Sequence, residues 1–141
     1  MDYREAYEKA LQLLNVRFLS EGELKAKLRR RGVDDDVLED VVAALEGEHF
    51  LDDQRLARDV YRYYARKGQY GHLYIVNRLR RRCLPVPEDV ERPDENALAG
   101  DLVKRKFSYR ADEARKAARF LQYRGFSPSV IRDVLEDFTV H

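Results

Sequence analysis

The chain has 141 residues, of which 44% are hydrophobic and 38% charged, and its net charge is only +1. This length suits one compact domain or a short array of small units and leaves little room for a separate catalytic domain. A single cysteine, Cys83, excludes an internal disulfide and a cysteine-based metal site. Because no apolar run is long enough for a signal peptide or a membrane helix, we expect a soluble, cytoplasmic protein.

The near-neutral total hides alternating blocks of charge. Residues 33–53 contain nine acidic and no basic side chains, whereas residues 54–82 contain nine basic and one acidic. Residues 102–125 form a second basic block, with eight basic and two acidic side chains. Segregated charge creates local fields that the net charge does not reveal, so we expect strongly basic surfaces.

The first predicted helix spans about residues 4–18, and the second begins after Ser20. Ser20 followed three residues later by Glu23 predicts a capping box at the start of this second helix. Gly32 supplies the left-handed residue that ends it. A third helix is expected from Asp34, which is placed to cap it.

The fourth predicted helix spans residues 53–66, and the fifth ends at Cys83. The apolar residues that mark the fifth helix are Leu73, Val76 and Leu79. Cys83 stands where the first part of the chain has Gly32. The stretch LPVPEDVERPDEN follows with three prolines, which leave room for at most a short helix over about residues 87–92.

The last third of the chain predicts one helix over residues 95–106 and one on each side of Gly125. An apolar stripe marks the helix before this glycine: Ala114, Ala117, Ala118 and Leu121. Ser127 is placed to cap the final helix, and Pro128 occupies its first position.

Three similar stretches explain how these helices are grouped. LRRRGV (28–33), LRRRCL (79–84) and LQYRGF (121–126) each end one predicted helix and precede the next. With one further helix ahead of each pair, they predict three tandem three-helix repeats. The predicted units are residues 1–50, 51–94 and 95–141. We therefore expect an all-α protein of about nine short helices that form an elongated, curved array.

A stripe of arginines on the fourth helix is the strongest functional signal. Arg55, Arg58, Arg62 and Arg66 lie within roughly 60° of one line on a helix, opposite Leu56, Ala57, Val60 and Tyr64. A solvated face is the alternative, but such a face usually alternates with acids. Tyr63 and Tyr64 are expected to pack in the core rather than to contact a partner.

The predicted partner-binding surface extends beyond this stripe. Its members are Arg55, Arg58, Arg62, Arg66, Lys67, Tyr74, Arg78, Arg81 and Arg82. For a second basic patch, a binding role and a merely solvated face are equally favoured. Its members are Lys104, Lys106, Arg110, Arg115, Lys116 and Arg119. Arginine forks suit phosphates or carboxylates, and tyrosines supply stacking contacts.

Other patterns favour structural roles over chemistry. The acidic residues Asp34, Asp35, Asp36, Asp52 and Asp53 suggest a metal site, but all stand at predicted helix starts, where capping and the helix dipole favour acids. The three histidines, His49, His72 and His141, are scattered. We find no nucleophile–base pattern, and we expect no catalysis and no cofactor.

Three groups of residues, in order over roughly residues 7–138, carry a family resemblance. They are Ser20, Glu23, Leu24, Lys27, Leu28 and Gly32; then Leu51, Asp52, Asp53 and Ala57; then Arg124, Gly125, Phe126 and Ser127. The ordered set resembles the RecX family, bacterial regulators of the RecA recombinase. This resemblance implies three tandem three-helix units. It also implies binding along the groove of the RecA–DNA filament, which damps ATP hydrolysis and strand exchange.

We therefore expect a non-enzymatic, monomeric regulator whose partner is the RecA filament and which does not bind membranes. The alternative is a small module that binds single- or double-stranded DNA without a recombinase. A third interpretation is a helical scaffold for another partner. Salt dependence separates the first two, because a binder of DNA alone loses affinity steeply as salt rises.

Overall fold

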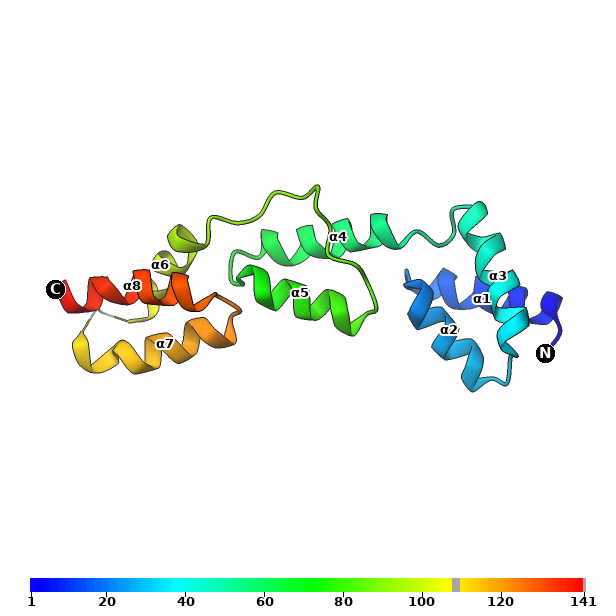
Figure 1. Cartoon of the computed structure of the whole chain (residues 1–141), viewed down its shortest axis with the longest axis horizontal. Helices are drawn as coiled ribbons and strands as arrows, with labels where there is room; N and C mark the ends of the chain where they lie inside the picture. Colours follow the sequence, from blue (N-terminus) through cyan, green and yellow to red (C-terminus); the bar gives the residue numbers. More distant parts are fainter. Residues whose placement is uncertain (108–109, 141) are drawn as a thin grey trace. The chain divides into compact units, whose positions relative to one another are not determined.

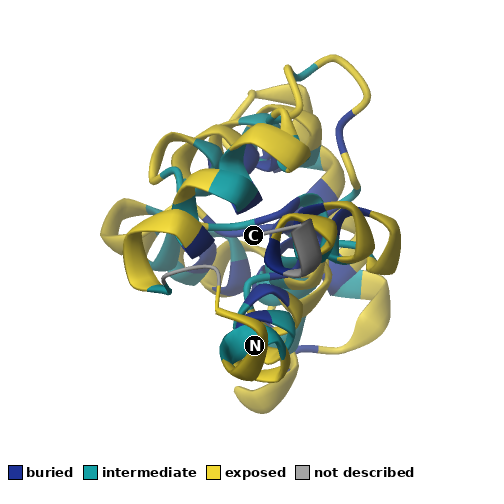
Figure 2. Cartoon of the chain, turned by 90° about the vertical axis from the view of Figure 1, so that its left-hand side faces the viewer, coloured by how far each residue is buried: buried dark blue, intermediate teal, exposed yellow. Residues whose placement is uncertain are grey.

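The computed structural model describes residues 1–107 and 110–140, and all regular structure in this part of the chain is helical (Figure 1). It comprises eight α-helices and one short 3-10 helix, so the all-α prediction is confirmed. The chain divides into two compact units. The first contains residues 1–59 and 79–87, and the second contains residues 60–78 and those from 88 onward. Buried residues lie on the inward faces of the helices (Figure 2).

The first unit is built on α1 (Tyr3–Val16), α2 (Glu21–Arg30) and α3 (Asp35–Gly47). Helix α1 packs against both α2 and α3. Each helix buries an apolar stripe at helical spacing, and together these stripes exclude water from a single core. The buried side chains are Ala6, Ala10, Leu24, Leu28, Leu38, Val41, Val42 and Leu45.

The ends of these helices follow their sequence signals. Ser20 Oγ accepts a hydrogen bond from the Glu23 amide at 3.1 Å, and Glu23 Oε1 accepts one from the Ser20 amide at 2.9 Å. The predicted capping box is therefore confirmed. Gly32 has a φ of 84°, the left-handed conformation expected of it. Asp34 stands at the start of α3, but its side chain makes no cap hydrogen bond.

Helices α4 (Asp53–Arg66) and α5 (His72–Arg81) each contribute residues to both units. One expectation for their buried sides is wrong: Leu73 on α5 is 49% exposed, although Val76 and Leu79 are buried. On α4, Ala57 and Val60 are buried and Tyr64 is half-buried on the expected face, and Tyr61 is fully buried, which the sequence did not indicate. Helical spacing defines only a broad apolar face. Neighbours from other helices decide which residues of that face are covered.

The segment between α5 and α6 differs from the segments that follow Gly32 and Gly125, each of which leads directly into a helix. Cys83 has a φ of 58° and so adopts the left-handed conformation without being a glycine. Residues 84–94 contain no helix, and the short helix expected over 87–92 is replaced by a bend at 88–90. The three prolines in this range each lack an N–H donor and restrict the residue before them, which disfavours a helix.

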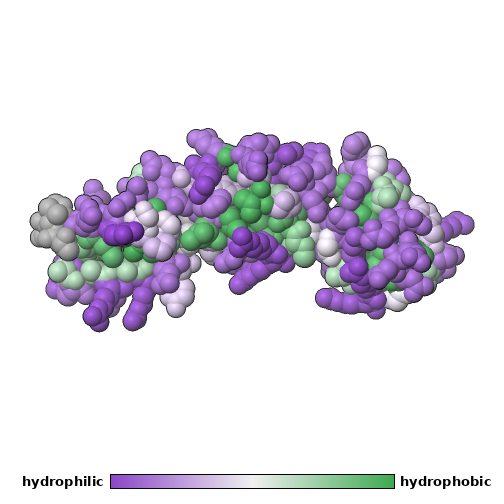
Figure 3. Space-filling model, in the orientation of Figure 1, coloured by the Kyte–Doolittle hydropathy of each residue, from purple (hydrophilic) through white to green (hydrophobic). Residues whose placement is uncertain are grey.

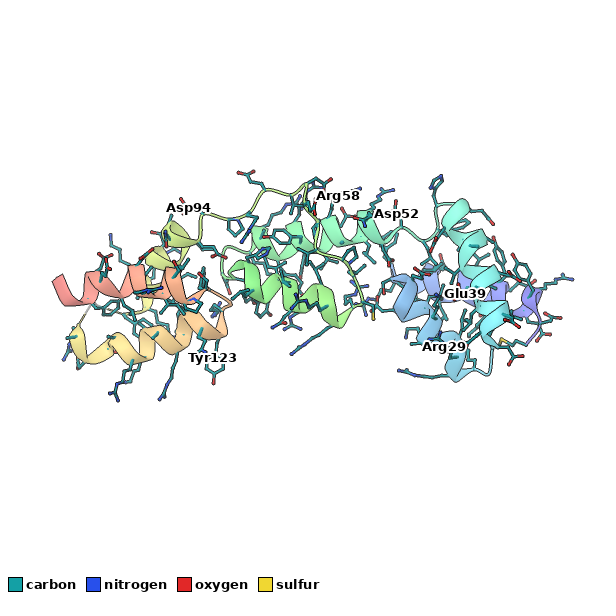
Figure 4. The ribbon with its side chains drawn as sticks, in the orientation of Figure 1. Arg29, Glu39, Asp52, Arg58, Asp94 and Tyr123 are labelled. Carbon is teal, nitrogen blue, oxygen red and sulfur yellow. The ribbon has the colours of Figure 1, made fainter. Side chains whose placement is uncertain are left out.

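The second unit contains α6 (Glu95–Lys106), the 3-10 turn η1 (Ala111–Glu113), α7 (Ala114–Tyr123) and α8 (Pro128–Val140). Its main core consists of Ala99, Val103, Ala117, Leu121, Phe126, Val130, Val134 and Phe138. Asp94, labelled in Figure 4, caps α6 by accepting a hydrogen bond from the Ala97 amide at 3.2 Å.

The turn between α7 and α8 also agrees with prediction. Gly125 has a φ of 83°, the left-handed conformation that ends α7. Ser127 Oγ accepts a hydrogen bond from the Val130 amide at 3.3 Å, and Pro128 is the first residue of α8. The predicted end of α7, the cap of α8 and the first residue of α8 are therefore all confirmed.

Candidate partner-binding surface

The arginine stripe lies on one uninterrupted helix, α4. Arg55 and Arg58 fall in the first unit, and Arg62 and Arg66 fall in the second. Arg58 is partly buried and is labelled in Figure 4, whereas the other three are exposed. Within the described part of the chain, these three exposed guanidinium groups form no ion pair. Their donors are therefore available to phosphates or carboxylates of a partner.

Four tyrosines of the second unit gather beside the end of this helix. The rings of Tyr70 and Tyr74 stack with centroids 3.9 Å apart and planes inclined by 6°. Tyr64 meets both edge-on, at 6.0 and 5.8 Å. Tyr63 meets Tyr64 edge-on at 5.1 Å, but it is 54% exposed. The cluster is thus packed at its centre and leaves one ring open to solvent. The expected packing role fits Tyr64, whereas the expectation that Tyr63 packs in the core is wrong.

Cations are held against this cluster. Arg78 donates hydrogen bonds from Nη2 and Nε to the Tyr74 hydroxyl at 2.8 and 3.1 Å. Burial alone would raise the pKa of Tyr74, but the hydrogen bond from Arg78 helps to lower this pKa below its ordinary value. Lys67 Nζ lies 4.7 Å from the centroid of the Tyr63 ring. These contacts fix the positions of two basic side chains that the sequence assigned to the binding surface.

Backbone hydrogen bonds between two turns of the second unit place the tyrosine cluster close to Arg124. The Gly71 amide donates to the Arg124 carbonyl at 2.7 Å, and the Leu73 amide donates to the Gly125 carbonyl at 3.1 Å. A Cβ atom on Gly125 would run into the backbone nitrogen of Tyr74. This close approach places the Arg124 guanidinium carbon 5.6 Å from the centroid of the Tyr70 ring.

Arg82 has an intramolecular partner, whereas Arg81 is exposed. Arg82 Nη2 lies 3.0 Å from Glu23 Oε1 and donates to the Phe18 carbonyl at 2.7 Å. Partial burial would raise the pKa of Glu23, but the hydrogen bonds from Arg82 and the Ser20 amide outweigh it and lower that pKa. Arg82 therefore stabilises the first unit, and its role in partner binding stays a prediction.

The second predicted patch is dispersed over α6, the turn η1 and α7. Lys104, Lys106, Arg115, Lys116 and Arg119 are exposed. Arg110 pairs with Asp112 at 3.2 Å, but both side chains are about two-thirds exposed, so we expect this pair to stabilise the turn little.

A basic hollow in the second unit was not anticipated from the sequence. Its volume is about 320 Å³. The residues that line it are Lys67, Gly68, Gln69, Leu102, Arg105, Lys106, Phe120 and Arg124. Only Lys67 and Lys106 were predicted to bind a partner. Arg105, Phe120 and Arg124 were missed, because packing between α6, α7 and the turn after α4 brings these residues together.

A larger hollow of about 850 Å³ has a more apolar lining that includes Leu73, Ile131 and Leu135. Tyr123, at its edge, is 83% exposed and projects from α7 in Figure 4. Hydrophilic side chains cover most of the face seen in Figure 3, and apolar side chains reach it in places.

Two of the acidic residues and one histidine make local structural contacts. Asp52 accepts a hydrogen bond from the Arg55 amide at 3.1 Å, and Asp53 accepts one from the Glu21 amide at 2.9 Å. His72 Nδ1 lies 2.9 Å from the Tyr61 hydroxyl, and burial lowers the pKa of His72. Among the described residues, no cluster of three or more His, Cys, Asp or Glu side chains could hold a metal ion. His141 lies outside the described residues.

These features define a class of protein: a helical protein with basic surfaces. Family models match two parts of the chain. The model described as "RecX, first three-helix domain" matches residues 6–45, and "RecX, third three-helix domain" matches residues 94–135. None of the helices described is both long and apolar enough to cross a membrane.

Curated relatives extend this match over most of the chain. "Regulatory protein RecX" of Prosthecochloris aestuarii is 31% identical over 96% of this chain and 95% of its own length. The protein of the same name from Pelodictyon phaeoclathratiforme is 32% identical over 89% of this chain and 84% of its own length. The Geobacillus kaustophilus relative is 29% identical, and this chain spans 56% of its length. The chain belongs to the RecX family of regulatory proteins, which is a non-enzymatic family.

Solved structures support the fold. The crystal structure of RecX from Lactobacillus salivarius matches with a TM-score of 0.80 and 20% identity, over 99% of this chain and 98% of that one. A second crystal structure of regulatory protein RecX matches with a TM-score of 0.76 and 21% identity, over 95% of this chain and 73% of that one.

Proposed function

We propose that this chain binds the RecA–DNA recombinase filament and inhibits its ATP hydrolysis and strand exchange, thereby modulating recombination and DNA repair. Membership of the RecX family supports a regulatory role, and the resemblance noted from the sequence names the filament as the partner. The observation that carries the proposal is that Arg55, Arg62 and Arg66 on α4 are exposed and form no ion pair with any residue in the described ranges.

The proposed mechanism is steric and electrostatic. A filament presents DNA phosphates and acidic protein side chains, both of which suit arginine forks. A regulator that occupies the filament groove and contacts several subunits would oppose the motions that ATP turnover and strand exchange require. The tyrosine cluster supplies aromatic contacts beside the cations, a composition typical of energetically important interface positions.

The test is direct binding to assembled filaments. Filaments would be formed by the cognate RecA on an immobilised single strand with a slowly hydrolysed nucleotide, and retention of the chain would be measured. We expect the parent to bind, and a variant with Arg62→Ala and Arg66→Ala to bind about tenfold more weakly, because charge-assisted hydrogen bonds are removed. The matched control, Arg30→Ala with Arg31→Ala, removes two exposed charges from the first unit.

A second candidate function is a DNA-binding module that acts without a recombinase, and the unanticipated basic hollow favours it. The two candidates differ in salt dependence. A binder of DNA alone would lose affinity in proportion to the number of phosphates it neutralises. A filament regulator would bind the RecA-coated strand more tightly than bare DNA and would retain more of its affinity as salt rises. Equal retention on bare DNA and on filaments would therefore favour the second candidate.

A further inference from the structure

The basic hollow of the second unit has the composition of an anion site. Lys67, Arg105, Lys106 and Arg124 line it, and none of the described lining residues carries a carboxylate. Four positive charges around a space of about 320 Å³ repel one another, and an anion bound between them would offset this repulsion. The rest of the lining is a glycine, an amide, a leucine and a phenylalanine, none of which could neutralise this charge.

Neighbouring side chains hold the cations in place before any ligand binds. Lys106 Nζ lies 4.5 Å from the centroid of the Phe120 ring, and the Arg124 guanidinium carbon lies 4.9 Å from the same centroid. Arg124 Nη1 also donates to Gln69 Oε1 at 2.9 Å. A guanidinium group has five N–H donors, so one bond to Gln69 leaves most of the fork for a ligand. A pre-positioned donor loses little conformational entropy on binding.

We propose that this hollow binds a phosphate group in the backbone of single-stranded nucleic acid. Several arginine and lysine side chains with no competing acid match phosphate geometry and charge. Tyr63 favours nucleic acid over an acidic peptide. Lys67, which lines the hollow, also lies 4.7 Å from the centroid of the Tyr63 ring, and this ring is 54% exposed. A flexible single strand with its phosphate in the hollow could stack a base on Tyr63.

This inference deepens the proposed function and rests on it in one respect: the strand would be the DNA on which the filament is assembled. The regulator would then contact DNA directly as well as the recombinase. The two claims fail separately, because the experiment below contains no recombinase.

The experiment measures fluorescence anisotropy of a labelled oligothymidylate with the full chain at low ionic strength. The variant Arg105→Gln with Arg124→Gln removes two charges from the hollow. The control, Arg30→Gln with Arg31→Gln, removes two exposed charges from the first unit. We expect the hollow variant to lose at least about tenfold in affinity. Its log–log salt slope should fall by about one for each phosphate that the variant no longer neutralises. The control should change little.

Further arms define the ligand. Arg124→Lys retains the charge but not the fork, so we expect an intermediate loss from a correctly folded protein, checked by thermal melting. Duplex DNA of equal length and polyglutamate of equal charge should bind or compete more weakly than the single strand. Equal losses in the hollow and control variants, equal competition by polyglutamate, equal binding of the duplex, or no binding by the parent would each overturn the proposal.

Discussion

At Gly125, two independent requirements fall on one residue. Its φ of 83° lies in the left-handed region, and a Cβ there would collide with the backbone of Tyr74. Gly32 has a similar φ of 84°, but a Cβ there would meet nothing within 4 Å. The LQYRGF stretch predicted the first requirement. The second depends on a contact between two turns far apart in the sequence.

Three glycine-to-alanine substitutions separate these effects. We expect Gly32→Ala to destabilise the protein by about 1–2 kcal/mol, the cost of a left-handed alanine. Gly125→Ala should cost more than about 3 kcal/mol, because the clash is added. Gly100→Ala, inside α6 with open space around it, should instead stabilise by about 0.5–1 kcal/mol. Urea unfolding measures all three, and equal costs at Gly32 and Gly125 would contradict the close turn–turn contact.

The Glu23–Arg82 pair predicts a pH dependence of stability. The pKa of Glu23 is lowered in the folded protein. The stabilisation that the ionised Glu23 carboxylate contributes is therefore present above the unfolded pKa of about 4.3, and it is lost as pH falls through the folded pKa. We expect Glu23→Gln to reduce the free energy of unfolding at pH 7 by about 1–2 kcal/mol and to converge with the parent as the pH falls below the folded pKa of Glu23.

The control for this pH dependence is Glu8→Gln. It breaks the Arg4–Glu8 pair, in which both side chains are mostly exposed. Exposed pairs of this kind contribute little, so the loss should be much smaller throughout this pH range. A Glu23→Gln loss that stayed constant as the pH fell below the folded pKa of Glu23 would show that Arg82 does not act through the ionised carboxylate.

At the scale of helices, their ends were easier to predict than their packing. The backbone conformation at a helix end depends on local residues, here Ser20, Gly32, Gly125 and Pro128. The local sequence is therefore enough to predict where these helices begin and end. Burial on α4 and α5 depends on distant helices, which is why the burial of Tyr61 was not anticipated and that of Leu73 was wrongly expected. The helix expected over 87–92 does not form. The expectation came from the repeat pattern, but the prolines in this segment disfavour helical backbone.

Two of the N-terminal caps of the first unit, Ser20 and Asp34, give a matched test. Ser20 is fully buried and makes both hydrogen bonds of its capping box, whereas Asp34 makes no side-chain cap bond. We expect Ser20→Ala to cost about 1–2 kcal/mol in thermal or urea unfolding. Asp34→Ala should cost distinctly less, since only its interaction with the helix dipole is removed. A larger loss at Asp34 would contradict the capping geometry described for α3.

The candidate site was also only partly predictable. The arginine stripe follows from the periodicity of a single helix, and the sequence therefore located it. The basic hollow joins the turn after α4 with α6 and α7, and Arg124 was noticed only as part of a helix stop. Arg82 is the opposite case, because the sequence assigned it to the binding surface. It lies in a basic run, but it pairs with Glu23, 59 residues away. Charge counts along the chain do not distinguish such internal partners from free cations.

For the whole molecule, family membership and the described all-helical fold agree with the sequence interpretation. The division into three-helix repeats at 1–50, 51–94 and 95–141 remains a proposal, as does their arrangement in an elongated, curved array. The structure itself groups the described residues into two compact units, with α4 and α5 contributing to both. Cys83 and the prolines interrupt the proposed repeat pattern in the middle of the chain, where residues 84–94 contain no helix.

The most direct test of the central claim is DNA-dependent ATP hydrolysis by the cognate RecA with this protein added. The parent would be compared with a variant carrying Arg55→Ala, Arg62→Ala and Arg66→Ala, and circular dichroism would check that the variant is folded. We expect the parent to inhibit hydrolysis and the variant to have lost most of that inhibition. Unchanged hydrolysis with the parent in excess over filament sites would contradict the proposed regulation of the filament, and full inhibition by the variant would contradict the assigned surface.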